Sequence, residues 1–223
     1  DVTAIPAFTP TTGSATLTLI PKANGCTGNS VDFTITVNPT PTVSATPASQ
    51  IVCSETATSI VLSGPVTGTT FSWTVVQSGT SGASNGSGST ISQTLTALGT
   101  SPGIATYTIT PSANGCDGIP INIDVTVRPN PHATATTASE IICSGTTTSI
   151  TLTSDVVGTV FSWTVLQSGV SGATIGTGNT INQTLTATGN SPGTATYTIT
   201  PSSNGCPGIP ITEVITVNPN PVI

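Results

Sequence analysis

The sequence repeats itself at a fixed offset of 90 residues. Residues 42–131 and 132–221 are identical at 59 of 90 positions, and neither copy has an insertion or a deletion relative to the other. Residues 1–41 align with 91–131 at the same offset. A period of this size is one small domain, so we expect a tandem array. The expected units are the C-terminal half of a truncated repeat at 1–41 and complete repeats at 42–131 and 132–221, cut from a longer array.

Within each repeat, apolar and β-branched residues alternate with Thr and Ser, which is the period-2 pattern of half-buried strands. Helix-period stretches are nearly absent. In the first complete repeat the pattern predicts strands at 42–47, 58–63, 70–77, 90–96, 104–110 and 121–128, with a short extra strand within 79–88. Six or seven short strands per repeat predict an all-β fold of tandem immunoglobulin-like antiparallel sandwiches.

Local signals refine this fold. Asn114-Gly115 predicts a tight hairpin before the last strand, because both turn positions tolerate a positive φ. The second copy has Glu213 where the first has Ile123, and we expect a bulge or an exposed strand start there. The joints VNPTPTV, VRPNPHA and VNPNPVI are short and rich in Pro. Alternating Pro residues stiffen a connector, so the domains should run end to end as a semi-rigid rod.

The charge composition excludes several functions. The chain has two basic residues, Lys22 and Arg128, against eight acidic ones, and its net charge is -6. A nucleic-acid binder needs a Lys/Arg patch, which two residues cannot make. His132 is the one histidine, and there is no CxxC pair and no D-x-D-x-D-G cluster. We therefore expect no metal, no cofactor and no catalytic constellation, and hence no enzyme.

The five cysteines indicate an exported, disulfide-bonded protein. They are Cys26, Cys53, Cys116, Cys143 and Cys206. Pairing within a repeat, Cys53 with Cys116 and Cys143 with Cys206, is the expected arrangement, and Cys26 would then lack a partner that lies upstream. The alternative is a bridge between neighbouring domains, such as Cys53–Cys206. It arises because the first loop and the last hairpin of such a sandwich lie at opposite ends.

Six aromatic residues are expected in the cores, two of them tryptophans. Trp73 shares a strand face with Phe71, which favours a core role over a sugar-stacking platform. The same holds for the second copy. The full set of expected core aromatics is Phe71, Trp73, Tyr107, Phe161, Trp163 and Tyr197.

The recurring motifs resemble a known family. They are the stretches Ile142 to Thr146, Phe161 to Val165, Tyr197 to Pro201, Asn204 to Cys206 and Val217 to Pro221. Together they resemble the PKD-like or immunoglobulin-like repeats of giant cell-surface adhesins in gliding Bacteroidota, the SprB type of gliding-motility adhesin. The first copy departs from this pattern with Glu55 in place of Gly145. The resemblance implies type IX secretion, an extracellular filament attached at the outer membrane, and contact with the secretion and motility machinery.

The function expected from the sequence is a structural and adhesive one. Near-identical copies suit a stiff stalk, and the polar, Thr-rich surface suits weak multivalent contact with a polysaccharide or a solid surface. Neighbouring repeats would be its other partners. One alternative is a discrete glycan- or protein-binding module that uses the Gly/Ser loops 78–88 and 168–178. Another is a self-polymerising filament subunit in which strands of another chain complete 1–41.

Overall fold

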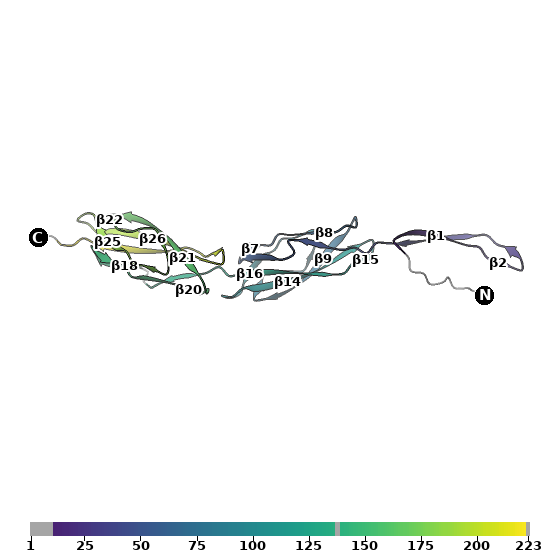
Figure 1. The fold of residues 1–223 in the computed structure, drawn as a ribbon, viewed down its shortest axis with the longest axis horizontal. Coiled ribbons are helices and arrows are strands. Elements are labelled where there is room, and N and C mark those ends of the chain that lie inside the picture. Colours follow the sequence, from purple (N-terminus) through teal and green to yellow (C-terminus); the bar gives the residue numbers. More distant parts are fainter. Residues whose placement is uncertain (1–10, 137–138, 222–223) are drawn as a thin grey trace.

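The computed structural model describes residues 11–136 and 139–221, and every regular element in them is a β-strand. The strands fall into three groups placed end to end (Figure 1). We call them the N-terminal segment (β1–β4), domain 1 (β5–β16) and domain 2 (β17–β28). The strands of the N-terminal segment are β1 (Gly13–Leu19), β2 (Lys22–Ala23), β3 (Cys26–Thr27) and β4 (Val31–Val37).

Domain 1 is a sandwich of one larger sheet and two small ones. Its strands are β5 (Ser44–Thr46), β6 (Gln50–Cys53), β7 (Thr56–Ala57), β8 (Ile60–Ser63), β9 (Thr70–Ser78), β10 (Thr80–Ser81), β11 (Gly86–Ser87), β12 (Thr90–Ile91), β13 (Thr94–Ala97), β14 (Gly103–Ala113), β15 (Cys116–Asp117) and β16 (Ile121–Arg128). The larger sheet has the order β11-β9-β14-β16-β6, with β15 paired to β14. The small sheets, β10-β13-β7 and β12-β8-β5, supply the opposite layer.

Domain 2 repeats this topology. Its strands are β17 (Ala133–Ala135), β18 (Ser139–Cys143), β19 (Thr146–Thr147), β20 (Ile150–Ser154), β21 (Val160–Ser168), β22 (Val170–Ser171), β23 (Gly176–Thr177), β24 (Thr180–Ile181), β25 (Thr184–Ala187), β26 (Gly193–Ser203), β27 (Cys206–Pro207) and β28 (Ile211–Asn218). The larger sheet has the order β18-β28-β26-β21-β23. The all-β fold of tandem sandwiches predicted from the alternating pattern is confirmed.

Alternation along the long strands builds the two cores. In β14, every second residue from Gly103 to Ala113 is buried. Side chains of a strand point alternately to opposite faces, so one face of this sheet packs inward and the Thr-rich face meets solvent. The N-terminal segment has the same strand register: β1 pairs Gly13 with Val37 as β14 pairs Gly103 with Val127. Its apolar residues are largely exposed, however, and Phe33 has 38% of its surface accessible.

Two local expectations fail. The strand β6 was not predicted, because Gln50–Cys53 is short and lies close to β5. It pairs in parallel with β16, which places Cys53 beside Arg128. The bulge expected at Glu213 is absent, since β28 keeps an unbroken register with Tyr197 opposite Glu213. The sheet therefore holds this carboxylate at the core position that Ile123 occupies in domain 1, with only 5% of its surface exposed.

Candidate functional site: the joint between the domains

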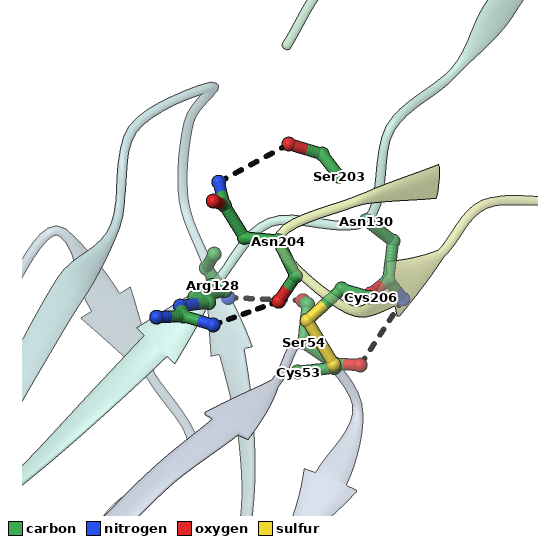
Figure 2. Close-up of a disulfide and its surroundings, with 8 residues drawn as sticks. Cys53, Ser54, Arg128, Asn130, Ser203, Asn204 and Cys206 are labelled. Carbon is green, nitrogen blue, oxygen red and sulfur yellow. Dashed lines mark hydrogen bonds between the residues drawn. A yellow bond between two sulfur atoms is a disulfide. The ribbon is translucent and has the colours of Figure 1, made fainter. Parts of the chain in front are cut away.

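The joint between domains 1 and 2 brings together two segments far apart in the sequence. One is the end of β6, which runs parallel to β16 and so finishes where domain 1 ends. The other is the hairpin between β26 and β27, whose turn is Asn204-Gly205. Asn204 has a φ of 51°, and Asn tolerates this left-handed conformation better than most residues. The hairpin reaches across the joint to the end of β6 (Figure 2).

A disulfide closes this joint. It links Cys53 to Cys206, with a Cα–Cα distance of 5.5 Å, and spans 153 residues of sequence. In the loop-entropy account, closing a loop of this length stabilises the folded chain by about 5 kcal/mol. The other three cysteines, Cys26, Cys116 and Cys143, are free within the described part of the chain.

The expected pairing within a repeat is therefore wrong, and the bridge between domains is the one formed. The reason is the direction of β6. Cys53 lies beside Arg128 at the last residue of β16, whereas Cys116 lies in the hairpin before the first residue of that strand. An eight-residue strand is about 26 Å long, and disulfide-bonded residues need Cα atoms within about 7 Å. The sequence analysis did not predict β6, and the direction of this strand is what decides between the two pairings.

Hydrogen bonds hold both sides of the disulfide. Arg128 Nη1 donates to the backbone oxygen of Asn204 at 2.7 Å, which ties the end of β16 to the hairpin of domain 2. Asn130 Nδ2 donates to the backbone oxygen of Ser54 at 3.1 Å, which fastens the connector to domain 1 (Figure 2). The connector and the hairpin are thus both fixed to the end of domain 1.

Close packing between glycine and proline completes the joint. A Cβ atom built on Gly208 would overlap the carbonyl oxygen of Pro131. Only glycine therefore lets the hairpin and the connector approach this closely. Gly118 stands in the same relation to Pro41 at the preceding joint. The geometry of the joint is therefore repeated at the 90-residue offset.

One hydrogen-bonded pair of side chains is particular to the second joint. The ring nitrogen Nδ1 of His132 lies 2.9 Å from Oδ2 of Asp155, and its backbone N–H donates to Oδ1 at 2.9 Å. The backbone hydrogen bond, followed by the other contacts with His132, lowers the pKa of Asp155. Thr42 and Pro65 hold the equivalent positions of the first complete repeat, so this pair does not recur.

A groove of about 360 Å³ lies beside the joint. Its walls include Glu55 and Leu98 from domain 1, Asn130 and His132 from the connector, and Ile209 from domain 2. Among the described residues, no group of three or more His, Cys, Asp and Glu is placed to hold a metal ion. The groove mixes apolar and polar groups, and none of its titratable residues is buried.

The six aromatic residues singled out in the sequence are all buried. The hydroxyl group of Tyr107 donates to Gln93 Oε1 at 2.8 Å, and Gln93 Nε2 donates to the backbone oxygen of Ser84 at 2.9 Å. Trp73 Nε1 donates to the same oxygen at 3.1 Å. Burial raises the pKa of Tyr107 to about 12. Tyr197, with Gln183, repeats this arrangement, and its pKa is also raised to about 12.

The Gly/Ser loops are fastened to these cores. Gln77 both donates to the backbone of Ala83 and accepts from it, and a Cβ on Gly86 would overlap the ring of Trp73. These contacts fix the loop against the buried tryptophan, so they give it a structural role in the sandwich. The indole face that a sugar-stacking platform would need is covered, with 7% of Trp73 exposed.

The buried Glu213 is a defect particular to domain 2. Its Oε2 atom has no hydrogen-bond partner among the described residues, and neither has Oε2 of Glu140 on the neighbouring strand β18. Burial raises the pKa of Glu213 because a charged carboxylate loses its water there. Domain 1 has Gln50 and Ile123 at these positions, and sequence comparison of the two copies was enough to flag the site.

Fold and joint together define a class of protein: rod-like tandem β-sandwich repeats. The sequence profile of the PKD-like domain matches residues 50–131 and 140–221, and the chain therefore belongs to the PKD-like domain family. No significant match to a curated protein was found. Repeats of this class are generally non-catalytic, and disulfide-bonded repeats of this kind are of an extracellular type.

Solved structures of other tandem β-sandwich proteins are similar at a coarse level. A three-immunoglobulin-domain structure of titin has a TM-score of 0.43 at 13% identity and covers 93% of this chain and 75% of that one. Cadherin domains 3–6 of protocadherin gamma B2 give 0.39 at 14%, with 94% and 60% covered. The fibronectin(III)-like modules of Clostridium thermocellum CbhA give 0.33 at 10%, with 80% and 95% covered. All three TM-scores are below 0.5, so the family assignment rests on the sequence profile.

Within residues 11–136 and 139–221, no helix is long and apolar enough to cross a membrane. The tandem PKD-like architecture is that of a structural or adhesive module of the extracellular type.

Proposed function

We propose that this chain is a stalk segment of a long extracellular surface filament that acts both as a stiff spacer and as a multivalent adhesin. The observation that carries the proposal is the joint. A flexible linker needs only a few residues, whereas this connector is held by a disulfide, by the Arg128 hydrogen bond and by the packing of Gly208 on Pro131. Fixing the angle between domains is useful where a chain must keep its reach under load.

The adhesive part of the proposal is supported by the outward faces. Thr and Ser are the commonest side chains on the outward face of β14, and the chain has few charged groups to repel a neutral surface. Polysaccharides and solid surfaces are the partners that fit such a face. Each contact would be weak, and repetition along a filament would multiply it.

The cellular setting follows the family resemblance of the motifs. We propose an SprB-type adhesin, exported by type IX secretion, attached at the outer membrane and moved along the envelope in gliding or surface attachment. Two of the motifs that carry the resemblance, the Asn-Gly-Cys hairpin and the Cys-Ser pair that follows the short parallel strand, form the joint as Asn204–Cys206 and Cys53-Ser54, which supports this assignment.

The experiment is the size of the native polypeptide on a reducing denaturing gel, probed with an antibody against this segment. A band of hundreds of kilodaltons supports the stalk. A band near 22.0 kDa refutes it.

For the adhesive role, beads coated with the chain at rising density are held on a polysaccharide film under flow. Retention that grows no faster than density contradicts multivalent adhesion.

A self-polymerising subunit is the second candidate, and one observation favours it. The sheet of β1 and β4 stands without an opposing layer in the described residues, and it exposes Val31, with 59% of its surface accessible, and Leu19, with 46%. A strand set from another chain could cover this face. The 22.0 kDa band that refutes the stalk is the outcome expected here.

A further inference from the structure

The far end of domain 2 has the same framework as the end of domain 1 that holds the hairpin. In domain 1, β6 pairs in parallel with β16 and sets Cys53 beside Arg128. In domain 2, β18 pairs in parallel with β28 and sets Cys143 beside Asn218. The thiol of Cys143 is exposed and free. Its position is therefore that of a disulfide partner whose other half is absent.

The hydrogen bond that fixes this surface is already formed. Asn220 Nδ2 donates to the backbone oxygen of Ser144 at 3.2 Å, which matches the 3.1 Å bond from Asn130 to Ser54 at the closed joint. This bond lies within one domain, so the receiving surface is built before any hairpin occupies it. Binding there would need little rearrangement.

The complementary surface is present at the other end of domain 1. The hairpin turn at Asn114 has a φ of 52°, as its counterpart in domain 2 has 51°, and it carries the free Cys116. Asn38 Nδ2 donates to the backbone oxygen of Asn114 at 3.0 Å, and Gly118 packs on Pro41. The non-covalent half of a joint is thus formed here, and only the cysteine on the facing side is missing.

We propose that the Cys143 end binds the Asn-Gly-Cys hairpin of a further repeat of this kind and joins it by a disulfide. By the same geometry Cys116 takes a cysteine on a strand that lies beside β4 as β6 lies beside β16. Each repeat then contributes its hairpin cysteine to a disulfide with the preceding repeat and its strand cysteine to a disulfide with the following repeat. We call these disulfides between domains staples. The inference stands on the joint alone and goes beyond the proposed filament role.

The covalent step needs an oxidant. Two thiols lose two protons and two electrons to form one S–S bond, and a small-molecule disulfide such as oxidised glutathione takes up both and becomes two thiols. Cys143 and Cys116 cannot pair with each other within one chain. They lie at the outer ends of two domains placed end to end (Figure 1).

The staples have a mechanical consequence for an array. The shortest covalent route runs along the chain from a hairpin cysteine to the next strand cysteine and then across a disulfide to the hairpin of the following repeat. Cys26 and Cys53 are 27 positions apart, as are Cys116 and Cys143 (53 minus 26 and 143 minus 116). Fully extended, this route is about 90–97 Å long.

That route spans two repeats. The eleven-residue strand β14 alone is about 36 Å long, so two repeats in a row are at least about 72 Å. The covalent route is therefore nearly straight in the folded state. A stapled array could lengthen by no more than about a third before a disulfide breaks.

The test lengthens the full chain after Ile223 by one additional copy of residues 134–221, which keeps the 90-residue offset at the new joint. The protein is refolded in a glutathione redox buffer, free thiols are blocked with N-ethylmaleimide, and disulfide-linked peptides are mapped by mass spectrometry. The expected result is two bridges: Cys53 to Cys206, and Cys143 to the hairpin cysteine of the added copy. Cys26, Cys116 and the added copy's counterpart of Cys143 should carry the blocking group.

The matched control carries Ser in place of that hairpin cysteine in the added copy. Cys143 should then be blocked while the bridge from Cys53 to Cys206 stays. Blocked Cys143 in the unsubstituted chain overturns the proposal, and so does a bridge from Cys143 to Cys206 or to Cys116. A misfolded added copy is recognised separately, because its buried Tyr and Trp residues would show solvent-exposed fluorescence.

Discussion

The disulfide predicts that most of the chain is shielded from tension. When the two ends of the chain are pulled, force runs from the N-terminus to Cys53, across the sulfur bridge to Cys206, and on to the C-terminus. The residues between them form a closed loop that carries none of the load. Both sandwiches lie mostly inside that loop, so the oxidised chain should lengthen only through the parts outside it, which are the N-terminal segment and the strands β5, β6 and β28.

The magnitude follows from the loop. The bridge spans 153 residues of sequence, and an extended residue contributes about 3.3–3.6 Å. Reduction should therefore release about 500–550 Å of additional contour length. Each sandwich, once freed, should appear as a separate unfolding step of roughly 300 Å less its folded length.

The assay is single-molecule force spectroscopy with handles at the two termini. The oxidised chain is compared with the same chain in a reductant and with the Cys206→Ser variant, which should behave as reduced in any buffer. The Cys143→Ser variant keeps the bridge and serves as the matched control. If the oxidised chain, its bridge verified by mass spectrometry, shows two full unfolding steps, then the load path described here is wrong.

Three further predictions concern the joint and the cores. Gly208→Ala should open the joint and slow disulfide formation, since its Cβ meets the carbonyl oxygen of Pro131, whereas Gly189→Ala, with open space around it, should not; the rate of thiol loss during refolding decides this. Glu213→Ile should stabilise domain 2 by about 1–3 kcal/mol at pH 7. Because the folded pKa of Glu213 is raised, its favourable contribution exists below its unfolded pKa and is lost as pH rises, so the gain in urea unfolding should shrink toward pH 4, and a gain independent of pH would contradict this. The two tyrosines should ionise near pH 12 rather than 10, and stability should fall over that range; an ultraviolet titration with a midpoint at 10 in the folded protein would argue against their burial.

Much of the fold could be predicted because the repeat supplies its own comparison. The alternating pattern on Tyr107 and its neighbours recurs around Tyr197 at the same offset, and a pattern that appears twice is hard to produce by chance. Burial on one face of each long strand follows directly. The core aromatics were identifiable from that face alone.

The disulfide pairing could not be predicted, for a reason that is local. Four residues, Gln50–Cys53, cross from one layer to the other and pair in parallel at the edge of the larger sheet. A strand this short has no periodicity to recognise, yet its direction decides which end of the domain Cys53 reaches. At Glu213 the difference between the two copies was visible in the sequence, but the bulge predicted from it is wrong. The strands on either side hold β28 in register at the cost of a buried carboxylate.

The joint also explains which residues vary between copies. A head-to-tail contact between repeats is heterologous, so every repeat must carry both complementary surfaces. The acceptor at each joint is a backbone oxygen of the hairpin turn, contributed by Asn114 at one joint and Asn204 at the next. The donors differ, Asn38 and Arg128, because any side chain that reaches a backbone oxygen can serve.

The hairpin has no such freedom. Its Asn-Gly turn needs positive φ angles, its cysteine needs a fixed position, and the following glycine needs a Cβ-free contact with proline, as Gly118 and Gly208 show. Asn-Gly-Cys-x-Gly is accordingly kept in all three copies of this segment, while the residue between Cys and Gly changes from Thr27 to Asp117 to Pro207. The part of the repeat under the tightest geometric constraint is the part that contacts the preceding domain, which is what an array built for a fixed joint angle requires.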